Sequence, residues 1–132
     1  MAKILVVDDD SHVVKATVRI LASSGYDVET AANGADGLLV LDEASLPDCV
    51  VLDVDMPTLS GPEMAAAMVM RDHGEEKVPI LLVSGRPDLP AVAARVGTPY
   101  SLSKGSPEYP RLLLETLARV LVEKTPPAAP QL

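Results

Sequence analysis

Cysteine occurs only once in this chain of 132 residues, at position 49, and a single thiol excludes an internal disulfide and a cysteine-based metal cluster. Cys49 lies in a short apolar run, which predicts a buried side chain that acts as a small hydrophobic group. No apolar run approaches the roughly 20 residues of a membrane span, so we expect a soluble protein without membrane insertion. The N-terminus is unlike a signal peptide, and a cytoplasmic location is therefore expected.

Basic residues are also few, with 11 Lys and Arg against 19 Asp and Glu, which gives a formal net charge of -8. This negative charge disfavours direct binding to nucleic acid or anionic lipid and favours divalent cations or basic partner surfaces. The length and the 48% of hydrophobic residues indicate one domain with a sizeable core. We assign residues 1–124 to this domain and the proline-rich residues 125–132 to a tail or the stub of a linker.

Five short apolar runs alternate with helical patterns along the chain. The runs predict strands at residues 4–7, 26–30, 49–52, 80–83 and 100–102. The helical patterns lie at about residues 14–21, 35–41, 62–70, 89–96 and 107–122. Each parallel strand connection needs a crossover of about a dozen residues or more, so this alternation predicts an α/β fold of five βα units. Its parallel sheet is expected to be covered by helices on both faces.

Polar residues follow these apolar runs at their carboxyl ends. Asp8 and Asp9 follow the first run, Asp53 ends the third, Ser84 follows the fourth and Lys104 comes just after the fifth. Ligands of open α/β sheets bind at this edge. If the first and third strands are neighbours about 4.8 Å apart, the carboxylates of Asp8 and Asp9 come within reach of Asp53. Clustered carboxylates need a neutralising group, and oxygen ligands suit Mg²⁺, with Mn²⁺ as a second choice.

A magnesium site of this kind also prepares the edge for a phosphoryl group. An aspartate can act as the nucleophile and form an aspartyl phosphate, while Lys104 supplies a cation and Ser84 a hydroxyl donor. Each residue alone has an ordinary structural explanation: Asp10 or Ser11 as a helix N-cap, Ser84 as a turn residue, Lys104 as a surface lysine. Their conjunction at one edge favours the functional interpretation.

These segments resemble the receiver domain of bacterial two-component response regulators. The run of residues 3–10 is similar to the first strand and acidic pair of the family, and residues 51–57 with Gly61 are similar to its phosphoacceptor segment. Ser84 and Lys104 follow in the order of the family. The resemblance implies a flavodoxin-like (βα)5 fold, a three-layer sandwich whose five parallel strands have the order 2-1-3-4-5.

The resemblance also implies roles for the site residues. Asp53 would accept a phosphoryl group from a histidine kinase or a histidine phosphotransfer protein, Ser84 would hydrogen-bond a phosphoryl oxygen and Lys104 would pair with it. The implied Mg²⁺ ligands are Asp8, Asp9, Asp53 and the backbone carbonyl of Asp55. The chain would then be a signalling protein, catalysing only its own phosphorylation and dephosphorylation. Phosphorylation would control contacts with a downstream protein or a second copy of the chain, and Leu112 is a candidate for that surface.

Two positions depart from the pattern of this family. Ser101 stands where the family often has a switch aromatic, and the neighbouring Tyr100 is expected to face the other side of the sheet. The chain has no Phe or Trp to take this role. Gly105 stands where the family usually has a proline, often after a cis bond. A cis bond before glycine would cost about 2.5 to 4 kcal/mol, so we predict an altered loop at residues 104–107.

Two other functions are compatible with parts of the sequence. Residues 53–55 with Thr58 and Leu59 resemble the nucleophile motif of haloacid dehalogenase-like phosphatases, although no later strand ends in the acidic pair that such a site needs. A receiver-like module that binds partners without phosphorylation is the second alternative. Many turnovers on a phosphate ester would indicate the phosphatase, and no response to a phosphodonor with Mg²⁺ would indicate the binding module.

Overall fold

Strands and helices alternate along the computed structural model, which describes residues 1–43, 45–71 and 78–124. The strands are β1 (Lys3–Val7), β2 (Asp27–Ala31), β3 (Cys49–Asp53), β4 (Ile80–Ser84) and β5 (Tyr100–Ser103). The helices are α1 (Ser11–Ser23), α2 (Gly34–Glu43), α3 (Gly61–Met70), α4 (Leu89–Val96) and α5 (Tyr109–Lys124). The predicted succession of five βα units is confirmed.

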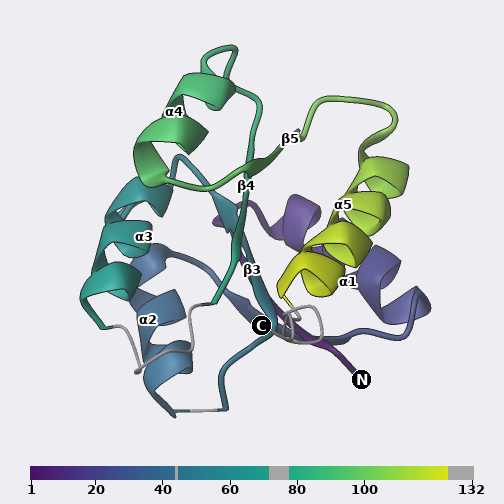
Figure 1. Cartoon of the computed structure of the whole chain (residues 1–132), viewed down its shortest axis with the longest axis horizontal. Helices are drawn as coiled ribbons and strands as arrows, with labels where there is room; N and C mark the ends of the chain where they lie inside the picture. Colours follow the sequence, from purple (N-terminus) through teal and green to yellow (C-terminus); the bar gives the residue numbers. More distant parts are fainter. Residues whose placement is uncertain (44, 72–77, 125–132) are drawn as a thin grey trace, which may run out of the picture.

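The five strands form one parallel sheet with the order β2-β1-β3-β4-β5 (Figure 1). Val7 at the end of β1 is in register with Leu52, so Asp8 and Asp53 leave neighbouring strands at the same level. Ser84 is in register with Ser103, the residue before Lys104. The strand order and the common edge predicted for the polar residues are therefore both confirmed.

Helices cover the two faces of this sheet, with α1 and α5 on one face and α2, α3 and α4 on the other (Figure 1). The strand residues alternate between the faces: Ile4 and Leu81 pack on the side of α1 and α5, whereas Leu5 and Leu82 pack on the opposite side. All four are fully buried. Strands buried on both faces explain why the sequence shows continuous apolar runs rather than apolar–polar alternation.

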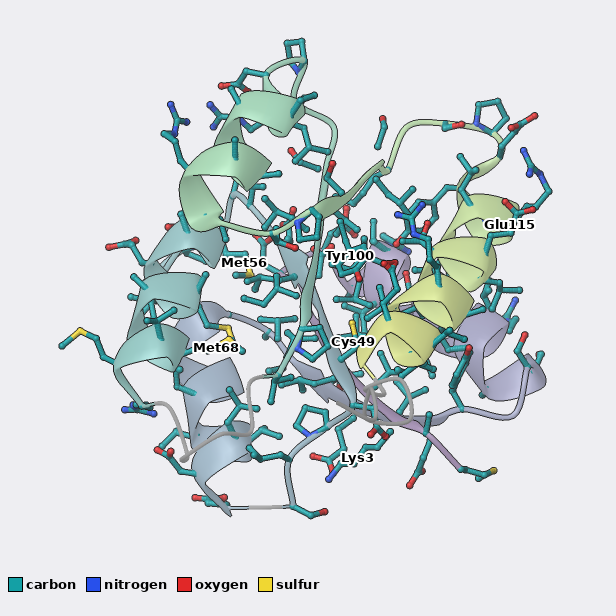
Figure 2. The ribbon with its side chains drawn as sticks, in the orientation of Figure 1. Lys3, Cys49, Met56, Met68, Tyr100 and Glu115 are labelled. Carbon is teal, nitrogen blue, oxygen red and sulfur yellow. The ribbon has the colours of Figure 1, made fainter. Side chains whose placement is uncertain are left out.

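Cys49 is fully buried in the core on the side of α1 and α5, as its apolar run predicts (Figure 2). The long stripe on α5 supplies three further fully buried residues, Leu113, Leu117 and Val120. Leu112 on the flank of this stripe is half-buried and so offers less surface to a partner than its sequence position indicates.

Several predicted boundaries differ from the observed ones by one to three residues, and helix α1, for example, begins at Ser11 rather than near residue 14. Strand β2 runs one residue later than predicted, from Asp27 to Ala31. Helix α5 begins at Tyr109 rather than near residue 107, because the preceding residues form a turn in which Ser106 accepts backbone hydrogen bonds from Glu108 and Tyr109. The assignment of residues 125–132 to a tail lies outside the described residues. Among the residues that the structure describes, none of the helices has the length and apolarity needed to span a bilayer.

Candidate functional site

Three polar side chains are buried at the carboxyl edge of the sheet. Asp8 follows β1 with 3% of its surface exposed, Asp53 ends β3 with 5% exposed, and Ser84 ends β4 with 2% exposed. A buried carboxylate is costly unless it is paired or hydrogen-bonded, so two of them side by side indicate a functional cluster rather than a packing solution.

Lys104 joins the two buried carboxylates. Its Nζ atom lies 2.9 Å from Asp8 Oδ2 and 2.9 Å from Asp53 Oδ1, and its backbone N–H donates to the carbonyl oxygen of Ser84 at 3.0 Å. The other carboxylate oxygen of Asp8 accepts from the backbone N–H of Asp10 at 2.9 Å. One ammonium group thus faces two carboxylates, which leaves the buried cluster with a net negative charge.

The third carboxylate of the site comes from Asp9, which is exposed at the mouth of the cluster. Oxygen atoms of Asp8, Asp9 and Asp53 all lie within 4.8 Å of one another. An all-oxygen set of this size and negative charge fits a hard divalent cation such as Mg²⁺. Asp55 lies in the loop after β3, and its carboxylate points to Arg86 at 3.1 Å rather than to the cluster.

The environment makes ionisation of Asp53 unfavourable. Burial, the largest effect, raises the pKa of Asp53 from 3.8 to about 6; the hydrogen bond from Lys104 opposes this rise, and the charges of Asp8 and Asp9 add to it. Burial also lowers the pKa of Lys104, but its hydrogen bonds to Asp8 and Asp53 outweigh that effect and hold the pKa above its ordinary value. Lys104 is therefore a permanent cation, and additional positive charge beside Asp53 would favour its ionised form.

Ser84 stands beside this cluster at the end of β4. Its Oγ atom accepts a hydrogen bond from the backbone N–H of Arg86 at 3.0 Å. A hydroxyl that accepts in this way keeps its own proton for donation. Ser84 is thus equipped to donate to an oxygen atom placed on Asp53.

The loop that follows Asp53 folds back tightly on β3. A Cβ atom on Gly61 would lie 2.2 Å from the backbone oxygen of Asp53, and the N–H of Gly61 donates to the backbone oxygen of Val54 at 2.9 Å. Only glycine leaves room for this approach. Ser60 and Glu63 then form a capping box that begins α3 directly after the loop.

Two buried hydroxyls near the site were not anticipated from the sequence. Thr17 on α1 and Tyr109 on α5 both have hydroxyl oxygens without a hydrogen-bond partner among the described residues. Burial raises the pKa of Tyr109. The neighbouring Thr17 hydroxyl and the charge of Lys104 oppose this rise, whereas the charge of Asp8 adds to it. Tyr109 precedes the buried Leu113 by four residues, so the stripe on α5 was the signal that could have placed it in the core.

The structure agrees with both departures from the receiver pattern. Tyr100 and Leu102 pack on the side of α1 and α5, so Ser101 between them lies on the opposite face, as the strand alternation predicts. The peptide bond between Lys104 and Gly105 is trans, since the described residues contain no cis bond. No aromatic side chain therefore occupies the position of the family's switch residue.

This fold and this acidic edge define a receiver domain, and the sequence comparison agrees. Residues 4–113 match the model of the response regulator receiver domain family. The chain belongs to this family, whose members are the receiver domains of two-component response regulators. This match over residues 4–113 favours the receiver family over the haloacid dehalogenase-like alternative, which rested on only a few residues around Asp53.

Known proteins similar to the chain are of the same kind. The transcriptional regulatory protein PrrA of Mycobacterium tuberculosis is 38% identical over 121 residues, which cover 89% of this chain and 48% of PrrA. The chain thus spans about half the length of the curated relatives that it matches.

Two solved structures show the same fold with nearly complete coverage. The chemotaxis protein CheY4 of Vibrio cholerae is 35% identical, with a TM-score of 0.80 over 92% of this chain and 99% of CheY4. The response regulator TrrA of Thermotoga maritima, solved in complex with Mg²⁺ and BeF, is 26% identical, with a TM-score of 0.79 over 92% of this chain and 100% of TrrA.

Proposed function

We propose that Asp53 is the phosphoacceptor of this receiver domain and takes its phosphoryl group from a histidine kinase or a histidine phosphotransfer protein. The observation that carries the proposal is the buried cluster at the sheet edge, in which Lys104 contacts both Asp8 and Asp53 at 2.9 Å. An exposed acidic residue, Asp9, completes a set of oxygen ligands next to the acceptor carboxylate.

The transfer requires Asp53 in its ionised form. A carboxylate oxygen of Asp53 attacks phosphorus, the new O–P bond forms as the P–N bond to the donor histidine breaks, and the imidazole leaves with a proton. Lys104 pairs with the phosphoryl group, and the hydroxyl of Ser84 donates to one of its oxygens. These groups need only small movements, because Lys104 already contacts Asp53 and Ser84 lies on the adjacent strand.

A divalent cation belongs to this proposal because the donor set fits one. We assign the Mg²⁺ ligands, with Mn²⁺ as a substitute, to Asp8, Asp9, Asp53 and the backbone carbonyl of Asp55. When bound, the metal ion neutralises charge on the carboxylates and on the phosphoryl oxygens. Complexation of TrrA, a similar receiver, with Mg²⁺ and BeF supports the assignment.

In this proposal residues 1–124 form the receiver domain, and residues 125–132 form a tail or linker. Its output is a contact with a downstream protein or with a second copy of the chain, controlled by phosphorylation. The net charge of -8 argues against direct contact of this domain with nucleic acid. We place the protein in the cytoplasm as a signalling protein whose chemistry is limited to its own phosphorylation and dephosphorylation.

The second candidate is a receiver that binds partners independently of phosphorylation. Ser101 at the usual switch position favours this candidate, since the described residues hold no aromatic side chain there. The intact acidic cluster favours the phosphoacceptor instead, because its buried carboxylates are an electrostatic cost without that use.

Intact mass spectrometry distinguishes the two candidates. The chain is incubated with acetyl phosphate or phosphoramidate and Mg²⁺, and a gain of about 80 Da is expected for one phosphoryl group. Asp53→Asn and a metal-free sample should show no gain in mass. Asp27→Asn, at an exposed position on β2, should gain the same mass as the chain without substitutions. No gain with any donor would favour the phosphorylation-independent module.

A further inference from the structure

Four helices begin directly after an Asp, Asn or Ser residue that can cap them, and one of these four residues does not. Asn33 caps α2 by accepting from the N–H of Asp36 at 2.9 Å. Asp10 caps α1 by accepting from the N–H groups of His12 and Val13, and Ser60 caps α3. Asp88 occupies the same position before α4 but makes no side-chain cap hydrogen bond. Its ψ of 15° also differs from the extended ψ of 108° at Asp10 and 169° at Ser60.

Arg86 explains why Asp88 does not cap its helix. The guanidinium donates from Nε to Oδ1 of Asp88 at 2.8 Å and from Nη2 to Oδ2 at 2.9 Å, so both carboxylate oxygens are engaged. The side-chain hydrogen bond from Arg86 lowers the pKa of Asp88 and keeps it ionised. The residue suited to cap α4 is thus held by an arginine two positions before it.

Arg86 also connects the two loops that flank Asp53. Its Nη1 atom lies 3.1 Å from Oδ1 of Asp55 in the loop after β3, and its backbone N–H donates to Oγ of Ser84 at the end of β4. The side chains of Arg86, Asp55 and Asp88 are all well exposed, at 41%, 65% and 46%. Because these groups face solvent, water and salt screen their ion pairs, and a more highly charged anion can compete for Arg86.

The geometry points to Arg86 as a switch residue that trades Asp88 for a phosphoryl group on Asp53, and thereby releases Asp88 to cap α4. The inference rests on the proposed function for its trigger. A phosphoryl group carries a charge of about -1.5 to -2 and three acceptor oxygens, compared with the single charge and two oxygens of Asp88, so its larger charge competes for the Arg86 guanidinium. Arg86 is an exposed cation that contacts Ser84 through its backbone N–H and Asp55 through its guanidinium.

The released carboxylate has a defined target on α4. Pro90 has no N–H, so the first donor that a cap can reach is the N–H of Ala91, which now donates to the backbone oxygen of Asp88 at 3.0 Å. Transfer of this hydrogen bond to the Asp88 side chain would tighten the first turn of α4. Phosphorylation would then reach α4 through a cap exchange, in a chain that has Ser101 instead of a switch aromatic.

Amide hydrogen exchange at Ala91, followed by NMR in the full chain, tests the exchange of partners. Addition of Mg²⁺ and beryllium fluoride should slow exchange at Ala91 by about 2- to 30-fold, the range expected when a helix gains an N-cap. Arg86→Gln and Asp88→Asn should both show slow exchange at Ala91 before Mg²⁺ and beryllium fluoride are added. Arg86→Gln frees the Asp88 side chain to cap α4, and in Asp88→Asn the amide can cap α4 because it does not form an ion pair with Arg86. Asp88→Ala should lose the response.

Arg71→Gln is the matched control, because Arg71 makes a similar exposed pair with Asp42 at 2.8 Å. Arg71 and Asp42 share a cavity with Val96 at the C-terminal end of α4, whereas Ala91 lies in its first turn. This variant should leave exchange at Ala91 unchanged. Unchanged exchange in Arg86→Gln and Asp88→Asn before any addition would overturn the inference. These two comparisons need no phosphodonor, so they can fail while Asp53 is still phosphorylated in the mass assay, and the mass assay can fail while they succeed.

Discussion

Replacing Asp53 with Asn in the metal-free protein should increase the free energy of unfolding. Burial beside Asp8 raises the pKa of Asp53 to about 6, compared with 3.8 for an ordinary Asp. The native state therefore binds this proton more tightly than the unfolded chain does. Ionisation of Asp53 consequently favours the unfolded chain, and this penalty grows as the pH rises from about 4 through 6.

The magnitude follows from the distance between the two pKa values. A separation of about two pH units, at about 1.36 kcal/mol per unit, makes the ionised carboxylate cost about 3 kcal/mol above pH 7. The neutral amide in Asp53→Asn avoids this cost, so the variant should be about 2 to 3 kcal/mol more stable at pH 8. The gain should shrink to about 1 kcal/mol at pH 4.5, where the native carboxyl is already protonated.

Urea unfolding followed by circular dichroism, with EDTA present, measures both values. Asp27→Asn, which neutralises an exposed carboxylate on β2, should change the free energy of unfolding by less than about 0.5 kcal/mol at either pH. A less stable Asp53→Asn at pH 8, or the same gain at both pH values, would refute the electrostatic reasoning.

Three further substitutions test the parts that position the site. Gly61→Ala should slow phosphorylation in the mass assay and destabilise the fold by about 1 to 3 kcal/mol, because its Cβ would lie 2.2 Å from the backbone oxygen of Asp53; unchanged phosphorylation would refute the close approach. Leu113→Ala should cost about 2 to 5 kcal/mol in urea unfolding, whereas Val122→Ala on the exposed side of α5 should cost little; equal costs would contradict the assigned faces. Asp10→Ala should cost about 1 kcal/mol, and Asp10→Asn less, if Asp10 caps α1.

The sheet and its acidic edge were predictable because the two central strands β1 and β3 end in an abrupt change from apolar to acidic residues. Val7 is followed by Asp8, and Leu52 by Asp53, so the sequence marks both the end of a buried strand and the start of the site. Parallel strands bring such ends to one edge, and the pairing of β1 with β3 does so here. Binary pattern and topology therefore carry most of the site.

Contacts made by loops were not predictable in the same way. A glycine between Ser60 and Pro62 is compatible with many turns, and only the folded loop shows that Gly61 lies against the backbone of Asp53. Arg86 and Asp88 are two residues apart, a spacing that brings side chains together in this turn but not in a regular helix. Interactions of this kind depend on backbone dihedral angles that apolar periodicity does not encode.

A crystal structure of the chain with Mg²⁺ and beryllium fluoride tests most directly whether Asp53 is the phosphoacceptor. We expect the beryllium fluoride on Asp53, paired with Lys104 and hydrogen-bonded by Ser84, and the metal ion held by Asp8, Asp9 and Asp53. A metal ion bound elsewhere, or Lys104 still shared between Asp8 and an unmodified Asp53 at saturating ligand, would contradict the assignment of this edge as the phosphoacceptor site.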